Sequence, residues 1–185
     1  MTQIFVVNSG SSSIKYQLVD LDTEQAVLSG LLERVGEPGS GIPDHEAGLR
    51  KVLETSFYAD GGNIARSQQA QLDAIMALSM LARVYDMRRM AVPPFVQEVL
   101  ARAVPALLGL VHADGGMGSW QGSGATAAEQ IQAIVTASGV RTRPLKQARD
   151  WGYQRLVANK VVLLADAAPP PIARVTEAGC ASTLA

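Results

Sequence analysis

Apolar and polar positions at the start of the chain follow the pattern of short β-strands. Gln3 to Asn8 is a run of β-formers that stops at a turn-forming cluster, Asn8-Ser9-Gly10-Ser11-Ser12-Ser13. Apolar side chains resume from Ile14 to Leu21 and, after a polar break, from Ala26 to Val35. The pattern predicts three consecutive antiparallel strands.

The middle of the chain has apolar residues at three- and four-residue steps, the spacing of amphipathic helices. Pro43-Asp44, after a glycine-rich loop, opens a first helical segment. A long helical pattern then runs from Ala65 to Arg89, and another from Pro94 to Val111 with a kink expected at Pro105. We expect these last two helices to form an antiparallel pair.

A third helix of this region is predicted from Thr126 to Ser138. Thr126 and Glu129 have the spacing of a capping box, in which each side chain bonds a free backbone amide of the first turn. After Gln154 the pattern changes to strand, and a last strand is expected near Ile172 to Leu184, beyond the break Pro169-Pro170-Pro171.

The fold class that follows is mixed α and β. An N-terminal three-stranded β-meander plus a helix comes first, then a helical hairpin, then the beginning of a β-rich region. The residue pattern of the sequence changes around residues 56 to 63. We therefore predict three parts, residues 1–56, 57–156 and 157–185.

Composition places the chain among globular proteins, with 48% hydrophobic and 18% charged residues in 185. A net charge of −1 gives no basic field for nucleic acid or an anionic membrane, so neither is an expected partner. The single cysteine, Cys180, forms no internal disulfide and is expected to be a small apolar residue. The N-terminus has no secretory pattern, which favours the cytoplasm.

Candidate chemistry lies in the run Asn8 to Lys15. A glycine and serine turn can aim several amides and hydroxyls at one point, which suits phosphate, and Gly10 permits backbone angles closed to other residues. Lys15 has the same strand parity as Ser13, so both can face one ligand. The P-loop pattern GxxxxGK[ST] is absent. From the residues alone, a plain hairpin with a solvated lysine remains the commoner alternative.

The segments FVVNSGSSSIKYQLVD, SGLLERVGEP and DHEAGLRKVLE resemble the N-terminus of acetate kinases, in the superfamily of sugar kinases, actins and heat-shock ATPases. The resemblance covers about residues 3 to 55. It implies a magnesium-linked role for Asn8, ATP phosphate contacts for Ser11 and Ser13, and an ATP-side contact for Lys15. The implied reaction transfers the γ-phosphoryl group of ATP to acetate, with ATP and Mg²⁺ as cofactors.

Acetate kinases also need an aspartate, arginines and a histidine around the transferred phosphoryl group, together with glycine-rich adenosine loops. The chain has candidates of these residue types, but their surroundings resemble no kinase motif: Arg66, Arg83, Arg88, Arg89, His112 and Asp114. No catalytic residue is therefore identified, and we expect a phosphate-handling segment without kinase turnover.

The remainder, about residues 57 to 185, resembles heparinase II/III-type polysaccharide lyases through YADGGNIARS, HADGGMGSWQGSG and VANKVVLLADAAPPP. The resemblance implies the end of an α/α toroid and the entry into a β-sandwich. Lyases of this kind use tyrosine and histidine as acid and base. Many relatives have histidine where this chain has Asn63, and we expect packing or surface roles for Tyr58, Tyr85, His112 and Trp120.

Three alternatives for the function follow. The chain is an acetate kinase-type phosphotransferase reduced to its first part, a fragment of a heparinase-like lyase, or a chimeric reading frame whose halves do not cooperate. Oligomeric state is not visible in the sequence.

Overall fold

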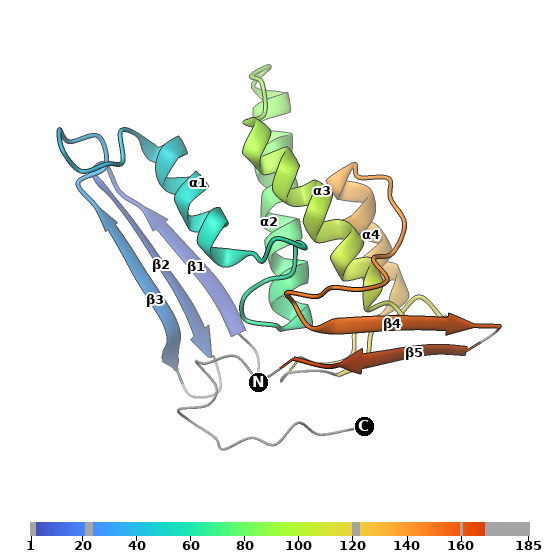
Figure 1. Ribbon diagram of the computed structural model, residues 1–185. Helices are drawn as coiled ribbons and strands as arrows, with labels where there is room; N and C mark the ends of the chain where they lie inside the picture. The colour runs from blue at the N-terminus through green and yellow to red at the C-terminus, as the bar shows by residue number, and fades with distance from the viewer. Residues whose placement is uncertain (1–2, 21–23, 120–122, 160, 169–185) are drawn as a thin grey trace.

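The computed structural model of the chain describes residues 3–20, 24–119, 123–159 and 161–168 (Figure 1). Trp120, Cys180, the proline break and the strand expected near Ile172 to Leu184 lie outside these described residues. The predicted fold class is confirmed, with small antiparallel sheets at both ends and four helices between them in the described part of the chain.

The N-terminal residues form the predicted β-meander. Strands β1 (Gln3–Ser9), β2 (Ser13–Asp20) and β3 (Gln25–Glu33) pair in sequence order, each antiparallel to the next. Asn8 lies opposite Lys15, and Lys15 lies opposite Leu31. Since directly opposed residues share a face of a sheet, this register assigns every side chain near the turn to one side or the other.

Helix α1 (His45–Ser56) covers one face of the meander (Figure 1). Asp44, as predicted, begins the helix, and its Oδ1 accepts the amide of Ala47 at 2.8 Å. Gly48 faces the sheet so closely that an added Cβ would lie 2.8 Å from Cδ1 of Ile14. The helix therefore rests on β2 immediately beside Ser13 and Lys15.

Helices α2 (Gln68–Met87) and α3 (Pro94–Gly109) run antiparallel, as predicted, and α4 (Ala128–Ser138) packs beside α2 (Figure 1). Pro105 lies inside α3, and the helix continues to Gly109. Their apolar faces enclose the larger core, which includes the fully buried Leu72, Ile75 and Leu107.

The predicted capping box of α4 is wrong. The N-cap residue is Ala127, which has no side-chain acceptor, and Thr126 instead pairs with Met117 through two backbone hydrogen bonds of 3.0 Å. That short antiparallel bridge extends Thr126 and satisfies its backbone groups, so the helix begins later than propensity suggests.

The strand pattern after Gln154 is a hairpin of two strands, β4 (Tyr153–Ala158) and β5 (Val161–Asp166). The turn contains Asn159, which has a positive φ of 54°. Asparagine tolerates this left-handed conformation better than most residues, which explains why one apolar run folds back here.

The buried apolar side chains of the described residues, apart from Val52, fall into two clusters. The larger one extends from Leu53 to Tyr153 through the helices, and the smaller one consists of Ile14, Val35 and Ile42, with Leu32 and Ala47 packed against it. Helix α1 contributes to both clusters, and β1 also lies beside α2. Among the described helices, we find none that is long and apolar enough to cross a bilayer.

Candidate functional site

The serine-rich turn, Gly10 to Ser12, lies at one end of the meander, close to the end of β3 and the start of α1. It joins β1 to β2 at the same end of the meander at which β3 finishes and α1 begins (Figure 1). Two contacts tie the turn to its neighbours. Val35 donates its amide to the carbonyl of Ser12 at 2.9 Å, and Nε2 of His45 lies 2.7 Å from the carbonyl oxygen of Gly10.

Three of the four predicted site residues share one face of the sheet. Asn8 and Lys15 are directly opposed, and Ser13 has the same parity as Lys15 on β2. Asn8 and Lys15 are exposed, whereas Ile14, between Ser13 and Lys15, is buried on the other face under α1. The face that carries Asn8, Ser13 and Lys15 is therefore the open face of the meander.

Ser11, the fourth predicted residue, is exposed in the turn itself. Within the described part of the chain, the side chains of Asn8, Ser11, Ser13 and Lys15 make no hydrogen bond or ion pair. Their donors are thus turned toward solvent and can bind an external ligand.

Gly10 does not use the left-handed conformation that its freedom would allow, since its φ is not positive. A Cβ at this position would lie 3.4 Å from Oγ of Ser13. The glycine instead leaves room beside the last serine, and its amide donates to the carbonyl of Ser13 at 2.7 Å.

A magnesium ion fits this face only together with a ligand that brings its own oxygens. Asn8 offers one amide oxygen, whereas Mg²⁺ prefers several carboxylate, phosphate or water oxygens. No group of three or more histidine, cysteine, aspartate or glutamate side chains suited to a metal occurs among the residues that the structure describes. Nucleotide phosphates would have to supply the other ligands.

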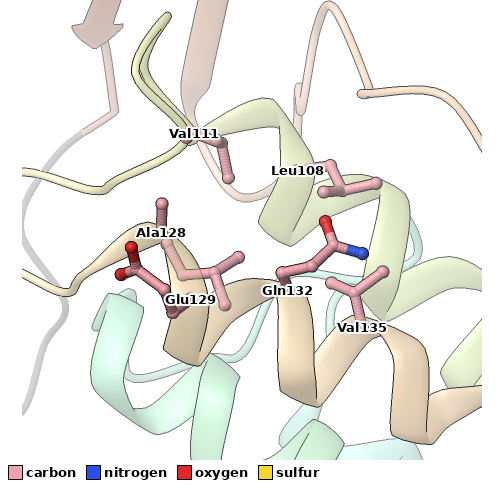
Figure 2. Close-up of a pocket in the computed structure, with 8 residues that line it drawn as sticks. Leu108, Val111, Ala128, Glu129, Gln132 and Val135 are labelled. Carbon is pink, nitrogen blue, oxygen red and sulfur yellow. The ribbon is translucent and has the colours of Figure 1, made fainter.

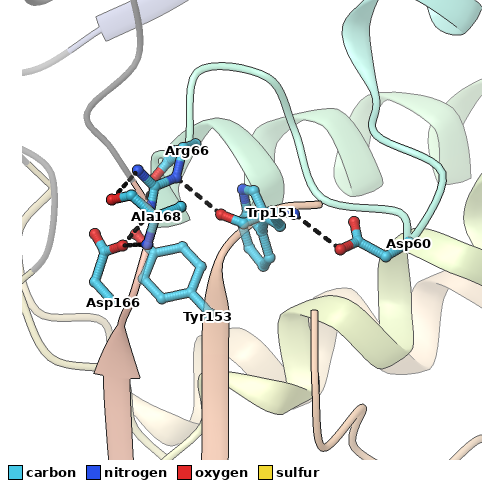
Figure 3. A network of polar contacts seen from close by, with 6 residues as sticks. All are labelled: Asp60, Arg66, Trp151, Tyr153, Asp166 and Ala168. Carbon is cyan, nitrogen blue, oxygen red and sulfur yellow. Dashed lines mark hydrogen bonds and ion pairs between the residues drawn. The ribbon is translucent and has the colours of Figure 1, made fainter. Parts of the chain in front are cut away.

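A second polar cluster joins the loop before α2 to the β4–β5 hairpin (Figure 3). Arg66 is 2% exposed. Its Nε donates to the carbonyl of Trp151 at 2.8 Å, and its Nη1 donates to the carbonyl of Ala168 at 3.1 Å. Its Nη2 forms an ion pair with Asp166. The hydroxyl of Tyr153 donates to the carbonyl of Arg66 at 2.9 Å. The Arg66 side chain is thus bonded within the chain and serves as a structural connection, whereas the buried Nε1 of Trp151 has no hydrogen-bond partner among the described residues.

Asp60 extends the same connection. Its Oδ2 accepts the amides of Asp150 and Trp151, both at 2.8 Å (Figure 3). The Trp151 ring also packs on Gly62. No local pattern indicates that Asp60 and Arg66 contact residues about 90 positions later; the one available signal was their place in the YADGGNIARS segment.

The side chains considered for lyase chemistry do not form one site. Tyr85 lies near the end of α2 and His112 follows α3, so the two are separated by the length of α3, about 24 Å for its 16 residues. Oδ1 of Asn63 accepts the amide of Ala65 at 2.9 Å, and Tyr58 packs against the larger core. The expected packing and surface roles agree with these positions.

A shallow groove of about 350 Å³ lies between the end of α3 and α4 (Figure 2). Its walls are mainly apolar, with Leu108, Val111 and Val135, and its polar groups come from Glu129 and Gln132. None of the predicted site residues lines it. Beside it, burial lowers the pKa of Arg155, whose Nη1 donates to the carbonyls of Gly109 and Val111.

Comparison with known families confirms both resemblances drawn from the sequence, to acetate kinases and to heparinase II/III-type proteins. The family model of the Acetokinase family matches residues 3–81, and the model described as Heparinase II/III-like, C-terminal, matches residues 140–185. The first match extends beyond Ser56 into α2.

The individual relatives match pieces of the chain. The acetate kinase of Leifsonia xyli subsp. xyli is 42% identical over 90 residues, covering 40% of this chain and 22% of that protein. The acetate kinase of Thermosipho melanesiensis is 55% identical over 51 residues, covering 28% and 13%. The chain thus spans about a fifth or less of the length of these curated acetate kinases.

One further relative covers both parts of the chain. The FtsZ-localized protein C of Caulobacter vibrioides is 26% identical over 167 residues, which is 88% of this chain and 29% of that protein. An alignment of this extent necessarily includes residues on both sides of the predicted boundary around residues 56 to 63.

Proposed function

We propose that the meander is the phosphate-binding part of an acetate kinase-type phosphotransferase, which takes the phosphates of ATP together with Mg²⁺. The observation that carries this proposal is the register that brings Asn8, Ser13 and Lys15 to one open face beside the exposed Ser11. The match of residues 3–81 to the Acetokinase family supports it.

The proposed roles follow from the chemistry of each group. The Lys15 ammonium neutralises phosphate charge, and the hydroxyls of Ser11 and Ser13 donate to phosphate oxygens. The amide oxygen of Asn8 faces the magnesium side of the bound nucleotide. Acetate is the proposed acceptor in the complete reaction, and the cytoplasm, where ATP is abundant, is the proposed location.

We expect this chain to bind ATP without turnover. Phosphoryl transfer depends on several positive groups around the equatorial oxygens of the transferred group. Among the described residues of the open face, Lys15 is the single cation, and Arg34 at the end of β3 is already paired with Glu37 at 2.7 Å. We therefore propose that the chain by itself holds ATP but does not form acetyl phosphate.

Calorimetric titration of the full chain with ATP and Mg²⁺ tests the binding. Lys15→Ala should weaken ATP binding about tenfold or more, since a charge-assisted hydrogen bond contributes about 1.5–3 kcal/mol. Lys51→Ala, at an exposed lysine of α1, is the matched control and should leave the affinity unchanged. Equal weakening by both variants, or no binding by the unaltered chain, would contradict the proposal.

Acetyl phosphate formation from ATP and acetate should stay at the background rate. A rate above background that Lys15→Ala abolishes would show that the chain is a working kinase, and the second half of the proposal would then be wrong.

For residues 57–168 we propose a structural role, because the Arg66 side chain is bonded within the chain and the lyase candidates are dispersed. Unsaturated products that absorb ultraviolet light after incubation with acidic polysaccharides would instead support the lyase alternative. The chimeric alternative is tested at the DNA level, where single reads crossing the codons for residues 50 to 65 should join both parts in one gene.

A further inference from the structure

Protein donors occupy the carbonyl groups of Gly10 and Ser12 in the serine-rich turn, and that of Ser13 directly after it. The oxygen of Gly10 meets Nε2 of His45, that of Ser12 accepts the amide of Val35, and that of Ser13 accepts the amide of Gly10. By contrast, the amides of Ser11 and Ser12 have no acceptor within the part of the chain that the structure describes.

Peptide geometry links these two observations. In a trans peptide the carbonyl and the following amide point in opposite directions. No described peptide bond is cis, so a Gly10 carbonyl directed at His45 turns the amide of Ser11 away from α1. The Ser12 carbonyl directed at Val35 fixes the amide of Ser13 in the same manner.

This arrangement favours the binding of an anion in two ways. The free amides of a turn form a concave donor group for phosphate oxygens. A carbonyl oxygen that rotated toward the same point would repel a phosphate, and the His45 contact holds the Gly10 oxygen away.

We propose that His45 is a positioning residue for phosphate binding, which acts through the Gly10 carbonyl to aim the Ser11 amide at the ligand. This inference rests on the proposed function. His45 does not touch the ligand; it fixes one peptide plane of the turn from the first residue of α1, 35 positions along the chain.

The rest of α1 makes this contact rigid. Asp44 fixes the start of the helix through the Ala47 amide, and Gly48 packs directly on Ile14 one turn later. Because the Gly10 carbonyl carries no proton, Nε2 of His45 is the donor, which the Nε2-protonated neutral ring and the doubly protonated ring both provide.

Two substitutions separate positioning from mere folding. His45→Ala removes the donor, whereas His45→Gln supplies a side-chain N–H of similar reach. His112→Ala, at the other histidine of the chain and also exposed, is the control. ATP with Mg²⁺ is titrated into each full-length variant by calorimetry, and amide shifts of Ser11 and Ser12 are followed by NMR.

The expected loss of affinity in His45→Ala is about fivefold, from a hydrogen bond worth about 1 kcal/mol. His45→Gln should recover most of the affinity, His112→Ala should match the unaltered chain, and ATP should shift the Ser11 amide less in His45→Ala than in the others.

Tight binding by the unaltered chain together with equal affinity in His45→Ala would overturn the inference while leaving the proposed function intact. A glutamine variant as weak as the alanine variant would also overturn it, because that pattern shows a packing role. If the unaltered chain binds no ATP, the proposed function fails and the inference fails with it.

Discussion

Gly62 lies so close to Trp151 that no side chain fits there. An added Cβ would lie 2.0 Å from Cγ of the Trp151 ring, which is itself fully buried. Gly62→Ala should therefore lower the free energy of unfolding by about 1–3 kcal/mol, the range for overpacked cores. Urea denaturation measures the change. Gly124→Ala, where a Cβ would meet nothing within 4 Å, should change stability by less than about 0.5 kcal/mol. Equal stability of the two variants would contradict this reading of the Trp151 contact.

At the residue scale, the sequence predicts where the candidate site residues lie on the sheet better than it predicts the contacts of the structural residues. The side on which Ser13 and Lys15 lie follows from strand parity alone, because the period of two is fixed by backbone geometry. Arg66 could not be predicted in the same way. Its partners, Trp151 and Asp166, come from elements far along the chain, and nothing local in an arginine signals burial.

Helix α2 contains a carboxyl group whose ionisation opposes folding. Burial raises the pKa of Asp73 from its ordinary 3.8, while the hydrogen bond from Gln69 lowers it by a smaller amount. With a raised pKa the folded chain binds the proton more tightly than the unfolded chain. Stability therefore falls as pH rises through the interval from 3.8 to the raised value, and the cost persists at neutral pH.

Asp73→Asn should remove that cost. At pH 7 the variant should have a larger free energy of unfolding than the unaltered chain. The gain should disappear below pH 3.8, where the Asp73 carboxyl group is protonated in both the folded and the unfolded chain. Denaturant titrations at the two pH values measure this. Glu98→Gln, exposed on α3, serves as the control without an expected gain. A gain of the same size at both pH values would show that charge is not the cause.

Among the elements, local signals succeeded where the partner of a residue lies nearby. The helix begins after Asp44 as expected, because the acceptor on Asp44 and the amide of Ala47 are only three residues apart. Thr126 failed as a cap since its backbone is held by Met117, a contact that the local sequence does not encode. The β4–β5 turn was missed for a related reason, namely that apolar residues continue on both sides of Asn159.

The molecule as a whole has two unequal hydrophobic clusters connected by α1. Among the side chains whose burial the structure describes, Ile14, Val35 and Ile42 form the smaller cluster and twenty others form the larger one. Leu53 of α1 already belongs to the larger cluster, so the packing of α1 crosses the boundary that we propose near residue 56, where the helix itself ends. A three-stranded sheet with one covered face is marginally stable by itself, which makes the meander the weaker part.

Unfolding should therefore occur in two steps. In a Trp120→Phe background, Trp151 fluorescence reports the larger cluster, and the methyl resonances of Ile14 report the smaller one. We expect the Ile14 signals to be lost at a lower guanidinium concentration than the Trp151 signal, because a three-stranded sheet is marginally stable by itself. Saturating ATP with Mg²⁺ should raise the Ile14 midpoint alone, since a ligand stabilises the part that binds it. Coincident midpoints at every ATP concentration would instead show that α1 couples both clusters into one cooperative unit, and the boundary near residue 56 would then have no energetic meaning.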